Sequence, residues 1–380
     1  MSVIQHERYF TSLPREYYTS ADLFAREVEQ IFTRQWMYVG QVGMIREPGD
    51  FFEANVAGES LLIVRDHEGT VRAYFNVCRH RGSEICGTGS AGKFKHIVCP
   101  YHSWSWDLAG NLRGVPGTRD GNAFGFADWP LHQARAAVFH GAIFVWTGET
   151  EPPPLREFIG DSADQSALAK VDPARQKLVR TERYRVQANW KLLLENNCEC
   201  YHCAGTHPSL GVSCNFQGMF LNEDGSSRSG GQHFPLREGM KTFSMDGAWV
   251  CRKPLGAYGP SYLDTPEAAR FSTGYILVPM FSALLYFADH GVNLQINPLS
   301  VDETELVCHW FVHEDAVEGT DYDNDAVTAV FDITNREDIA LAEGNQRGVR
   351  SRRYVPGPNS ASREPFVEHA LTSYLQLMGE

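Results

Sequence analysis

The stretch that decides the fold of this chain reads Cys78-Arg79-His80-Arg81-Gly82 and, after a gap, Cys99-Pro100-Tyr101-His102-Ser103-Trp104. Each segment follows a short strand-like run, residues 73–77 and 95–98, and opens into a loop. Together the two loop tips offer two thiolates and two imidazoles, which are common metal ligands. The spacing therefore predicts a metal site held between two loops.

The order of the ligands separates two kinds of metal site. In a Rieske [2Fe–2S] centre, one iron is bound by two Cys sulfurs and the other by two His nitrogens. Each loop here supplies one of each, so we expect Cys78, His80, Cys99 and His102 to bind such a cluster. The alternative is structural zinc, but zinc sites usually group Cys with Cys and His with His.

Composition narrows the class of protein. The chain has 380 residues, of which 43% are hydrophobic, which is enough for two domains with substantial cores. Its net charge of −13 disfavours nucleic acids and anionic membranes as partners, because both attract clustered Lys and Arg. No apolar run approaches a membrane span, and the first ten residues carry His6, Glu7 and Arg8. We therefore expect neither a membrane segment nor a secretory signal.

The cysteines favour a reducing compartment. There are nine, an odd number, and Cys198, Cys200 and Cys203 crowd one predicted helix, where mutual disulfides would be awkward. We therefore expect no disulfide among these three cysteines and a cytoplasmic location.

The chain divides into two regions with different sequence patterns, and no internal repeat is found. Residues 35–148 alternate short β-rich runs with turn signals and predict a small strand-built domain. Residues 149–154, rich in Pro and acidic side chains, are interpreted as a joint at the start of a second domain, 149–380, of α+β type. Residues 1–34 are expected to form a helical segment that packs on this second domain. The predicted elements of the second domain are a helix at 190–204, strands within 273–312, a long helix at 325–346 and a terminal helix at 364–378.

A second group of ligand-type side chains lies between Asn196 and His207, in the sequence NNCECYHCAGTH. Glu199 and His202 are three residues apart and share one face of the predicted helix, while Gly205 can end that helix so that His207 folds back beside His202. Leucines at 192–194 point in three directions, which predicts that the helix is buried. Buried imidazoles need partners, so the two histidines either bind a metal or are satisfied core histidines.

Two histidines leave a non-haem iron without its usual carboxylate ligand. Asp338 can supply it, because it falls within an apolar stripe of the long predicted helix, where a carboxylate is exceptional. Asp332 and Glu337 fall on other faces and are interpreted as solvated charges. His202, His207 and Asp338 then form a two-His-one-carboxylate triad for mononuclear iron. The stripe consists of Val327, Val330, Phe331, Thr334 and Leu341.

Longer segments around these ligands resemble one enzyme family. They are Asn189-Trp190-Lys191-Leu192, residues 195–203, Asp315-Ala316-Val317-Glu318-Gly319 and Asn345-Gln346-Arg347-Gly348. With the two ligand sets, they resemble the catalytic α subunit of Rieske non-haem iron oxygenases over nearly the whole chain. The resemblance is to the branch that oxidises quaternary ammonium compounds, such as glycine betaine monooxygenase and stachydrine demethylase.

The resemblance implies a β-rich Rieske [2Fe–2S] domain and a helix-grip (Bet v 1-like) catalytic domain with an antiparallel sheet and long helices. It also implies a head-to-tail homotrimer in which Glu199 bridges the iron ligand His202 and His102 of the partner subunit for electron transfer. A separate flavin and [2Fe–2S] reductase would deliver electrons from NADH or NADPH, since no glycine fingerprint for a dinucleotide follows a strand here. The implied reaction uses O2 to hydroxylate an N-methyl group, and the carbinolamine product releases formaldehyde.

One cysteine near the cluster is expected to differ from respiratory Rieske proteins. Those proteins brace their cluster loops with a disulfide, but Tyr101 occupies the position of one partner here. Cys86 is therefore expected to be a free thiol.

The substrate is expected to be held by aromatic faces, because these attract a trimethylammonium group. The candidate pocket residues are Phe243, Trp249, Phe281, Tyr286 and His290. The segment between His207 and Phe243 is shorter than in the betaine enzymes, and Met280-Phe281-Ser282-Ala283 replaces a stretch that carries Trp and Asn in them. The reaction class could thus be kept with another substrate, and the rival is a Rieske oxygenase that hydroxylates or O-demethylates an aromatic acid.

Two broader alternatives concern the class of protein. A plain Rieske electron carrier would need no second metal set, which leaves the length of the chain unexplained. A zinc protein, either a hydrolase or a structural protein, would be colourless.

Overall fold

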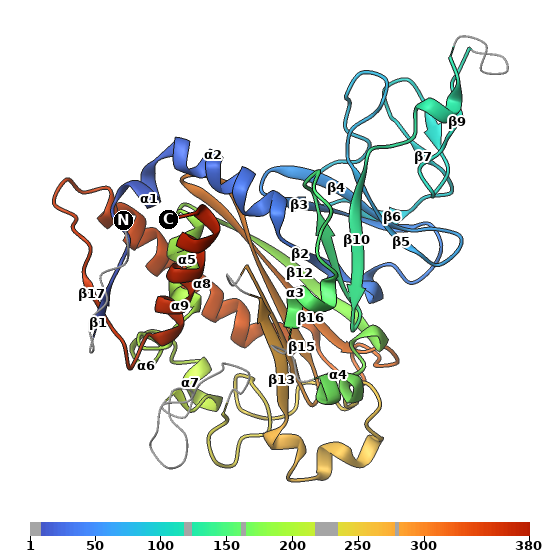
Figure 1. Ribbon diagram of the computed structural model, residues 1–380. Helices are drawn as coiled ribbons and strands as arrows, with labels where there is room; N and C mark the ends of the chain where they lie inside the picture. Colours follow the sequence, from blue (N-terminus) through green and yellow to red (C-terminus); the bar gives the residue numbers. More distant parts are fainter. Residues whose placement is uncertain (1–8, 118–123, 161–164, 217–234, 278–280) are drawn as a thin grey trace. The chain divides into compact units, whose positions relative to one another are not determined.

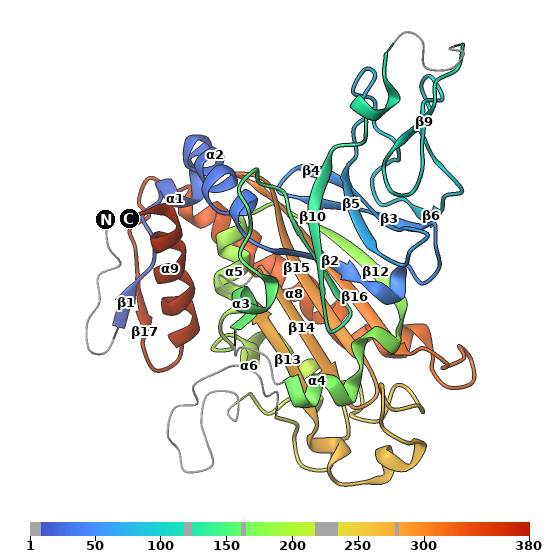
Figure 2. The ribbon, with the colours of Figure 1, turned by 45° about the vertical axis from the view of Figure 1, so that its right-hand side comes forward.

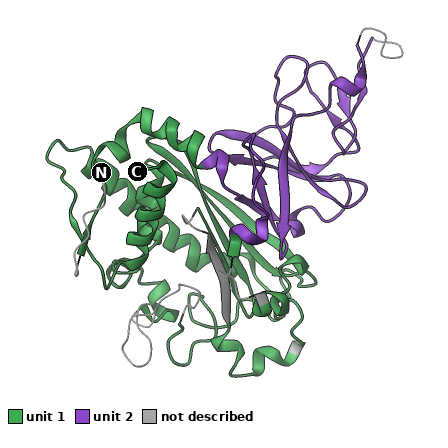
Figure 3. Ribbon diagram, in the orientation of Figure 1, with its two compact units in different colours: residues 1–31, 159–380 green, residues 32–158 purple. Residues whose placement is uncertain are grey.

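The computed structural model describes residues 9–117, 124–160, 165–216, 235–277 and 281–380 (Figure 1). The chain divides into two compact units, the strand unit of residues 32–158 and the helix–sheet unit of residues 1–31 and 159–380 (Figure 3). Both contain antiparallel sheets, and the helix–sheet unit adds long helices. The predicted α+β class is therefore confirmed.

The strand unit is built around a seven-stranded antiparallel sheet in the order β2-β11-β10-β5-β4-β3-β6. Its β4–β5 hairpin turns where Asp66 accepts the backbone N–H groups of Glu68 and Thr70, each at 2.9 Å, and Gly69 has a left-handed φ of 81°. The strands are β2 (Met37–Gln41), β3 (Asp50–Val56), β4 (Glu59–Arg65), β5 (Val71–Phe75), β6 (Ala91–Lys93), β10 (Gln133–Phe139) and β11 (Ala142–Trp146).

A three-stranded sheet completes this unit. It consists of β7 (Ile97–Val98), β8 (Ser105–Trp106) and β9 (Leu112–Gly114). Trp106 is fully buried at its centre and donates its indole N–H to the carbonyl of Trp129 at 3.1 Å. Cys78 and Cys99 belong to the same hydrophobic core. The small sheet therefore supports the two loops that follow these cysteines.

The helix–sheet unit contains a five-stranded antiparallel sheet in the order β12-β16-β15-β14-β13. The strands expected within 273–312 are confirmed, but sequence reasoning misses β12, because Arg and Glu interrupt its apolar pattern. Those charges are paired across the sheet, Arg183 with Glu305 at 3.0 Å and Arg185 with Glu303 at 3.2 Å. The strands are β12 (Gln176–Val186), β13 (Ser272–Leu277), β14 (Ser282–Phe287), β15 (Gly291–Ser300) and β16 (Glu303–His313).

Helices α5 (Trp190–Asn197) and α8 (Asn324–Val349) pack on each other and against this sheet (Figure 2). Asp323 caps α8 by accepting the N–H of Ala326 at 2.9 Å. The predicted helices at 325–346 and 364–378 are confirmed as α8 and α9 (Pro365–Met378). No helix in the described part of the chain is both long and apolar enough to cross a membrane.

The remaining elements are short. They are α1 (Glu16–Thr19), α2 (Ala21–Gln30), α3 (Leu155–Ile159), α4 (Gln165–Val171), α6 (Cys203–Thr206), α7 (Leu210–Ser213) and the strand pair β1 (Tyr9–Thr11) and β17 (Pro358–Ser360). Helices α1 and α2 belong to the same unit as residues 159–380.

Helix α5 ends at Asn197, so the prediction of a helix that continues to residue 204 is wrong. Past its end, the Glu199 carboxylate accepts the backbone N–H groups of Tyr201 and His202, the latter at 3.3 Å. A local side-chain bond of this kind competes with the helical hydrogen bonds. The chain therefore turns at residues 198–202 before the short helix α6.

The stretch at 149–154 is attached to the strand unit, which extends to residue 158. The indole N–H of Trp36 donates to the carbonyl of Pro153 at 2.8 Å, and Arg135 pairs with Glu151 at 3.0 Å. These contacts hold the Pro-rich stretch against the strands, so the unit boundary lies several residues after the predicted joint.

A buried ion pair joins the N-terminal helix α2 to α5. Glu27 and Lys191 are both fully buried, and the Lys191 ammonium donates to Glu27 Oε1 at 2.5 Å. The same carboxylate accepts the indole N–H of Trp190 at 2.8 Å and the hydroxyl of Tyr374 on α9 at 2.7 Å. Burial lowers the pKa of Lys191, while Glu27 opposes that change. Helices α2, α5 and α9 are thus connected through one carboxylate.

Lys191→Met is expected to lower the free energy of unfolding by about 3–5 kcal/mol, because it leaves the Glu27 charge buried without its cation. Chemical denaturation checks this. The matched control is Arg26→Met, which removes an exposed pair with Glu380 and should cost less than about 1 kcal/mol. Equal losses in the two variants would contradict the importance of the buried pair.

Candidate functional sites

The two loop tips of the strand unit have matching backbone conformations. The N–H of Gly82 donates to the carbonyl of Cys78 at 2.9 Å, and the N–H of Ser103 donates to that of Cys99 at 3.1 Å. Gly82 and Ser103 both have a left-handed φ, 72° and 57°, which is uncommon for a residue other than glycine. Each loop thus closes a tight turn just after its cysteine and presents its histidine at the tip.

The four expected cluster ligands lie together. The Cys78 and Cys99 side chains are buried, and the His80 and His102 rings are 4.6 Å apart between centroids. Burial raises the pKa of Cys78, and the adjacent Cys99 thiol raises it further. A bound metal would replace these protons. Two sulfurs and two imidazoles in this arrangement fit Rieske-type ligation.

Aromatic contacts support the histidine side of this group. The Trp104 ring stacks on His80 at 4.8 Å between centroids and an angle of 2°. The Arg79 guanidinium lies over the ring of Trp129 at 5.3 Å. Cys86 is a free thiol, so that prediction is confirmed.

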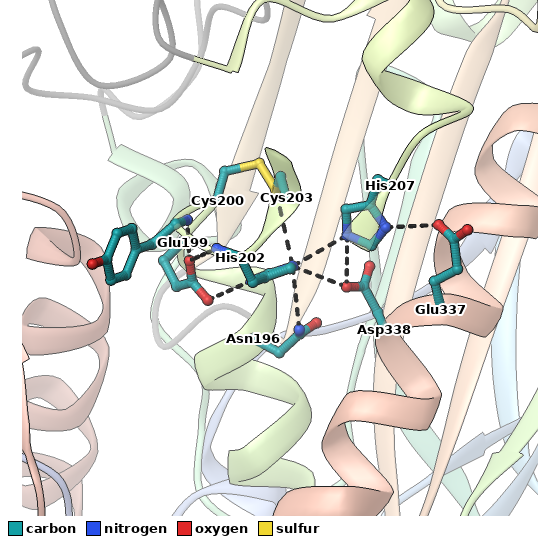
Figure 4. Close-up of a disulfide and its surroundings, with 9 residues drawn as sticks. Asn196, Glu199, Cys200, His202, Cys203, His207, Glu337 and Asp338 are labelled. Atoms are coloured by element: carbon teal, nitrogen blue, oxygen red, sulfur yellow. Dashed lines mark hydrogen bonds and ion pairs between the residues drawn. A yellow bond between two sulfur atoms is a disulfide. The ribbon is translucent and has the colours of Figure 1, made fainter. Parts of the chain in front are cut away.

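The second site forms where His202, His207 and Asp338 meet (Figure 4). His202 Nε2 lies 3.1 Å from His207 Nε2 and 3.1 Å from Asp338 Oδ1, and His207 Nε2 lies 3.0 Å from the same oxygen. Two ligands held at right angles about 2.1 Å from one ion lie about 3 Å apart. The three atoms therefore fit a single metal ion with the ligand set of non-haem iron.

Charge holds these side chains together. Burial disfavours protonation of His202, but hydrogen bonds with Asp338 and Glu199 outweigh it and raise its pKa to about 9. The pKa of His207 is also raised, because Asp338 outweighs burial. Burial alone would raise the pKa of Asp338, yet the two histidines lower it on balance. A divalent cation at neutral pH must therefore displace protons from the imidazoles.

Glu199 orients the first of these histidines. Its Oε1 lies 2.5 Å from His202 Nδ1, so the opposite nitrogen, Nε2, faces His207 and Asp338. The same carboxylate caps the turn after α5. Glu199 therefore fixes both the backbone and the ring of His202.

Helix α8 supplies Asp338, but its apolar stripe differs from the prediction at one end. Val327, Val330, Phe331 and Thr334 are buried, whereas Leu341 is 37% exposed. The buried face continues through Ala342 instead, because an α-helix has 3.6 residues per turn and the stripe drifts around it.

Glu337 is a site residue that sequence reasoning misses. It was interpreted as a solvated charge, yet its Oε2 lies 2.8 Å from His207 Nδ1, and its side chain is only 26% exposed. A carboxylate on the far nitrogen of a metal-binding histidine fixes the tautomer and orientation of the ring. The available signal was its position next to Asp338.

A cavity of about 130 Å³ opens beside the three ligand atoms. Its lining combines acidic, aromatic and aliphatic side chains, and no Lys or Arg is found among the described lining residues. The lining includes Glu199, His202, His207, Leu210, Phe243, Phe281, Leu285, Leu294, Ile296, Phe331 and Asp338. The cavity is therefore small and apolar over much of its wall, with its polar groups gathered at the ligands.

Two of the five predicted pocket residues, Phe243 and Phe281, line this cavity, and three do not. Trp249 donates its indole N–H to a backbone carbonyl at 3.1 Å. Tyr286 points to the face of β14 opposite its neighbour Leu285, a lining residue, and His290 is fully buried beside Asp289. Trp249, Tyr286 and His290 therefore have other surroundings and do not line the cavity. Met280 lies outside the described residues.

A disulfide joins Cys200 and Cys203 (Figure 4), so the expectation that Cys198, Cys200 and Cys203 form no mutual disulfide is wrong. The expectation assumed one continuous helix. Because α5 ends at Asn197, the chain turns and brings the two cysteines together, with Cα atoms 4.8 Å apart.

Glu337→Gln is expected to weaken binding of a divalent metal at His202 and His207 roughly tenfold, because the neutral amide orients the His207 ring less firmly. Calorimetric titration of protein with an intact cluster and a stripped second site measures this. Asp325→Asn, an exposed acid in the first turn of the same helix, is the control and should leave the affinity unchanged. A positioning role would be contradicted if Glu337→Gln lost metal affinity as completely as His202→Ala does. It would also be contradicted if the affinity did not change.

Comparisons with known proteins identify a family for each of the two parts of the chain. Residues 35–130 match the Rieske [2Fe-2S] domain model, and residues 174–380 match the model of the ring hydroxylating alpha subunit (catalytic domain). The glycine betaine monooxygenase oxygenase subunit of Pseudomonas aeruginosa is 32% identical, over 97% of this chain and 89% of its own length. The carnitine monooxygenase oxygenase subunit of Acinetobacter pittii is 27% identical, over 97% and 94%.

Solved structures show the same fold. The quaternary ammonium Rieske monooxygenase CntA in complex with L-carnitine superposes with a TM-score of 0.74 at 22% identity, covering 97% of this chain and 95% of that chain. Naphthalene 1,2-dioxygenase from Rhodococcus superposes with a TM-score of 0.71 at 20% identity, covering 97% and 94%. Because sequence similarity, both domain models and the fold agree over nearly the whole chain, it belongs to the Rieske non-haem iron oxygenases, as an α subunit with a [2Fe–2S] cluster and a mononuclear iron.

Proposed function

We propose that the chain is the oxygenase component of a two-component monooxygenase that hydroxylates an N-methyl group of a betaine or another quaternary ammonium compound. The cavity wall carries this proposal, because the rings of Phe243, Phe281 and Phe331 line it and no Lys or Arg is found among its described lining residues. A quaternary ammonium group cannot donate a hydrogen bond, is attracted by aromatic faces and is repelled by cationic side chains. The names of the glycine betaine and carnitine monooxygenase relatives support the same class.

The two ligand sets have separate tasks in this proposal. Cys78, His80, Cys99 and His102 would hold the cluster within a Rieske domain that the strand unit contains, and the second triad would hold iron within a catalytic domain that the helix–sheet unit contains. The cluster stores an electron and the iron activates O2. The triad consists of His202, His207 and Asp338.

The protein's own contribution is to hold the substrate and exclude water. Phe243 and Phe281 would contact the trimethylammonium group, while Leu285, Leu294 and Ile296 keep the cavity dry. The product is an N-hydroxymethyl ammonium compound. Its hydroxyl loses a proton, the C–N bond breaks with the electron pair returning to nitrogen, and formaldehyde leaves with a tertiary amine.

An aromatic acid fits the described cavity less well. Its carboxylate would find no Lys or Arg among the described lining residues, so no cationic side chain described there would offset the cost of burying its charge. The cavity is about the size of one known to bind benzene, about 150 Å³, so a ring alone is not too large. The lack of a cationic side chain among the described lining residues, rather than size, favours the quaternary ammonium substrate.

We infer a reductase partner, a homotrimer and a cytoplasmic location from the same assignment. A flavin and [2Fe–2S] reductase would supply electrons from NADH or NADPH, and the term oxygenase subunit in the relatives' names supports a separate reductase. A homotrimer would place Glu199 next to the partner's His102, which gives the electron a route between subunits. A cytoplasmic location would give the reductase access to its nucleotide.

A substrate panel tests the proposed function. Glycine betaine, carnitine and stachydrine are compared with aromatic acids for O2 uptake and formaldehyde release, with a surrogate reductase. We expect formaldehyde in proportion to O2 only with the N-methyl compounds, and hydrogen peroxide is measured to detect uncoupled uptake. Oxidation of aromatic acids, with no formaldehyde from any N-methyl compound, would contradict the proposal.

Glu199→Gln is expected to keep both metals but slow electron transfer from cluster to iron roughly ten- to hundredfold, because a neutral amide supports the His202 ring and its charge less well. Rapid mixing of the reduced protein with O2 and substrate, followed by the cluster absorbance, measures this rate. The amide still offers an oxygen to the backbone N–H of Tyr201, so the turn should persist. A rate equal to that of the wild type would contradict the bridge.

A further inference from the structure

A disulfide joins Cys200 and Cys203, which precede and follow His202 in the sequence, and all three residues line the cavity. Both cysteines are buried, 9% and 4% exposed, and both line the cavity beside the metal ligands (Figure 4). The other seven cysteines form no disulfide. This pair is therefore separate from Cys78 and Cys99 and has no part in the function proposed above.

Cys203 is within reach of the metal-ligand atoms. Its Sγ lies 3.9 Å from His202 Nε2. This sulfur, a nitrogen of His202 and a nitrogen of His207 all lie within 4.8 Å of one another. The thiolate, rather than a disulfide sulfur, is the metal ligand. Cys203 can thus join the two histidines only when the disulfide is broken.

The two oxidation states offer different ligand sets. In the disulfide state, two imidazoles and the Asp338 carboxylate form the set that suits non-haem Fe(II). In the dithiol state, a thiolate becomes available beside the same imidazoles. Thiolate and imidazole ligands together suit zinc, so reduction changes which metal the site favours.

We propose that Cys200 and Cys203 form a redox-controlled metal-selectivity site. Reduction makes the Cys203 thiolate available as an alternative ligand, which favours zinc. Oxidation removes this ligand, which favours iron. This inference rests on the proposed metal site at His202 and His207.

The redox step uses small reagents that can enter the cavity. For oxidation, two thiols give two electrons and two protons to hydrogen peroxide, the S–S bond forms and two water molecules leave. For reduction, a small dithiol breaks the S–S bond, forms its own disulfide and leaves one proton on each of Cys200 and Cys203.

Zinc X-ray absorption tests the proposal, because the zinc edge is unaffected by the iron of the cluster. Protein with an intact cluster and a stripped second site is loaded with zinc in the disulfide state and, after reduction and removal of the dithiol without air, in the reduced state. We expect a sulfur neighbour at about 2.3 Å from zinc only in the reduced state. The ratio of zinc to iron bound from an equal mixture should rise roughly tenfold on reduction.

Single substitutions identify the sulfur. Cys203→Ser should show no sulfur neighbour in either state, and Cys200→Ser should show one without added reductant. Cys251→Ser, a buried free cysteine outside the described cavity lining, is the matched control and should respond as the wild type does. If a variant fails to fold, alkylation of the reduced wild-type protein, mapped to Cys203 by mass spectrometry, should abolish the sulfur neighbour without a substitution.

The outcomes separate this inference from the proposed function. Reduced protein that binds no zinc would overturn both the inference and the metal site. Reduced protein that binds zinc with only nitrogen and oxygen neighbours would overturn the inference alone. A sulfur neighbour that persists in Cys203→Ser would point to Cys214, another cysteine of the wall, and would also overturn it.

Discussion

The helix–sheet unit depends on one constraint, which is to hold two imidazoles and a carboxylate within about 3 Å of one another inside the protein. Such a group is stable only when opposite charge lies among its members, either as protons or as a cation. His202 and Asp338 are separated by 136 residues along the chain. Two helices packed on one sheet bring them together, and a carboxylate behind each histidine fixes its ring. The long helix, the short helix and the sheet are all needed to meet this constraint.

The parts predicted from sequence are those that local chemistry determines. The Cys and His spacings in 78–102 and the buried acid at Asp338 depend only on residue type and helical or loop spacing, and the structure places each set together. The end of α5 was predicted wrongly because the Glu199 side chain competes for backbone N–H groups, which a periodicity argument does not consider. That error also concealed the disulfide between Cys200 and Cys203.

The parts that could not be predicted depend on tertiary packing. Glu337 looks solvated on a helical wheel, and only the return of His207 towards α8 gives it a partner. Of the candidate pocket aromatics, the wall includes Phe243 and Phe281, which lie in loops, and excludes Tyr286, which lies on the face of β14 opposite Leu285. Strand β12 was missed because its stabilising charge pairs are with a strand more than one hundred residues away, as for Arg183 and Glu305.

The carboxylate of Glu27 has a consequence for how the chain is made. Domains generally fold as units during synthesis, from the N-terminus onwards, so the strand unit can form before Lys191 leaves the ribosome, and Tyr374 leaves much later than Lys191. Until Lys191 and Tyr374 have both been synthesised, the Glu27 carboxylate of helix α2 remains hydrated. An interrupted synthesis would therefore release a chain with a complete cluster domain and an incomplete iron domain, a species that could store an electron but lacks the site that consumes it.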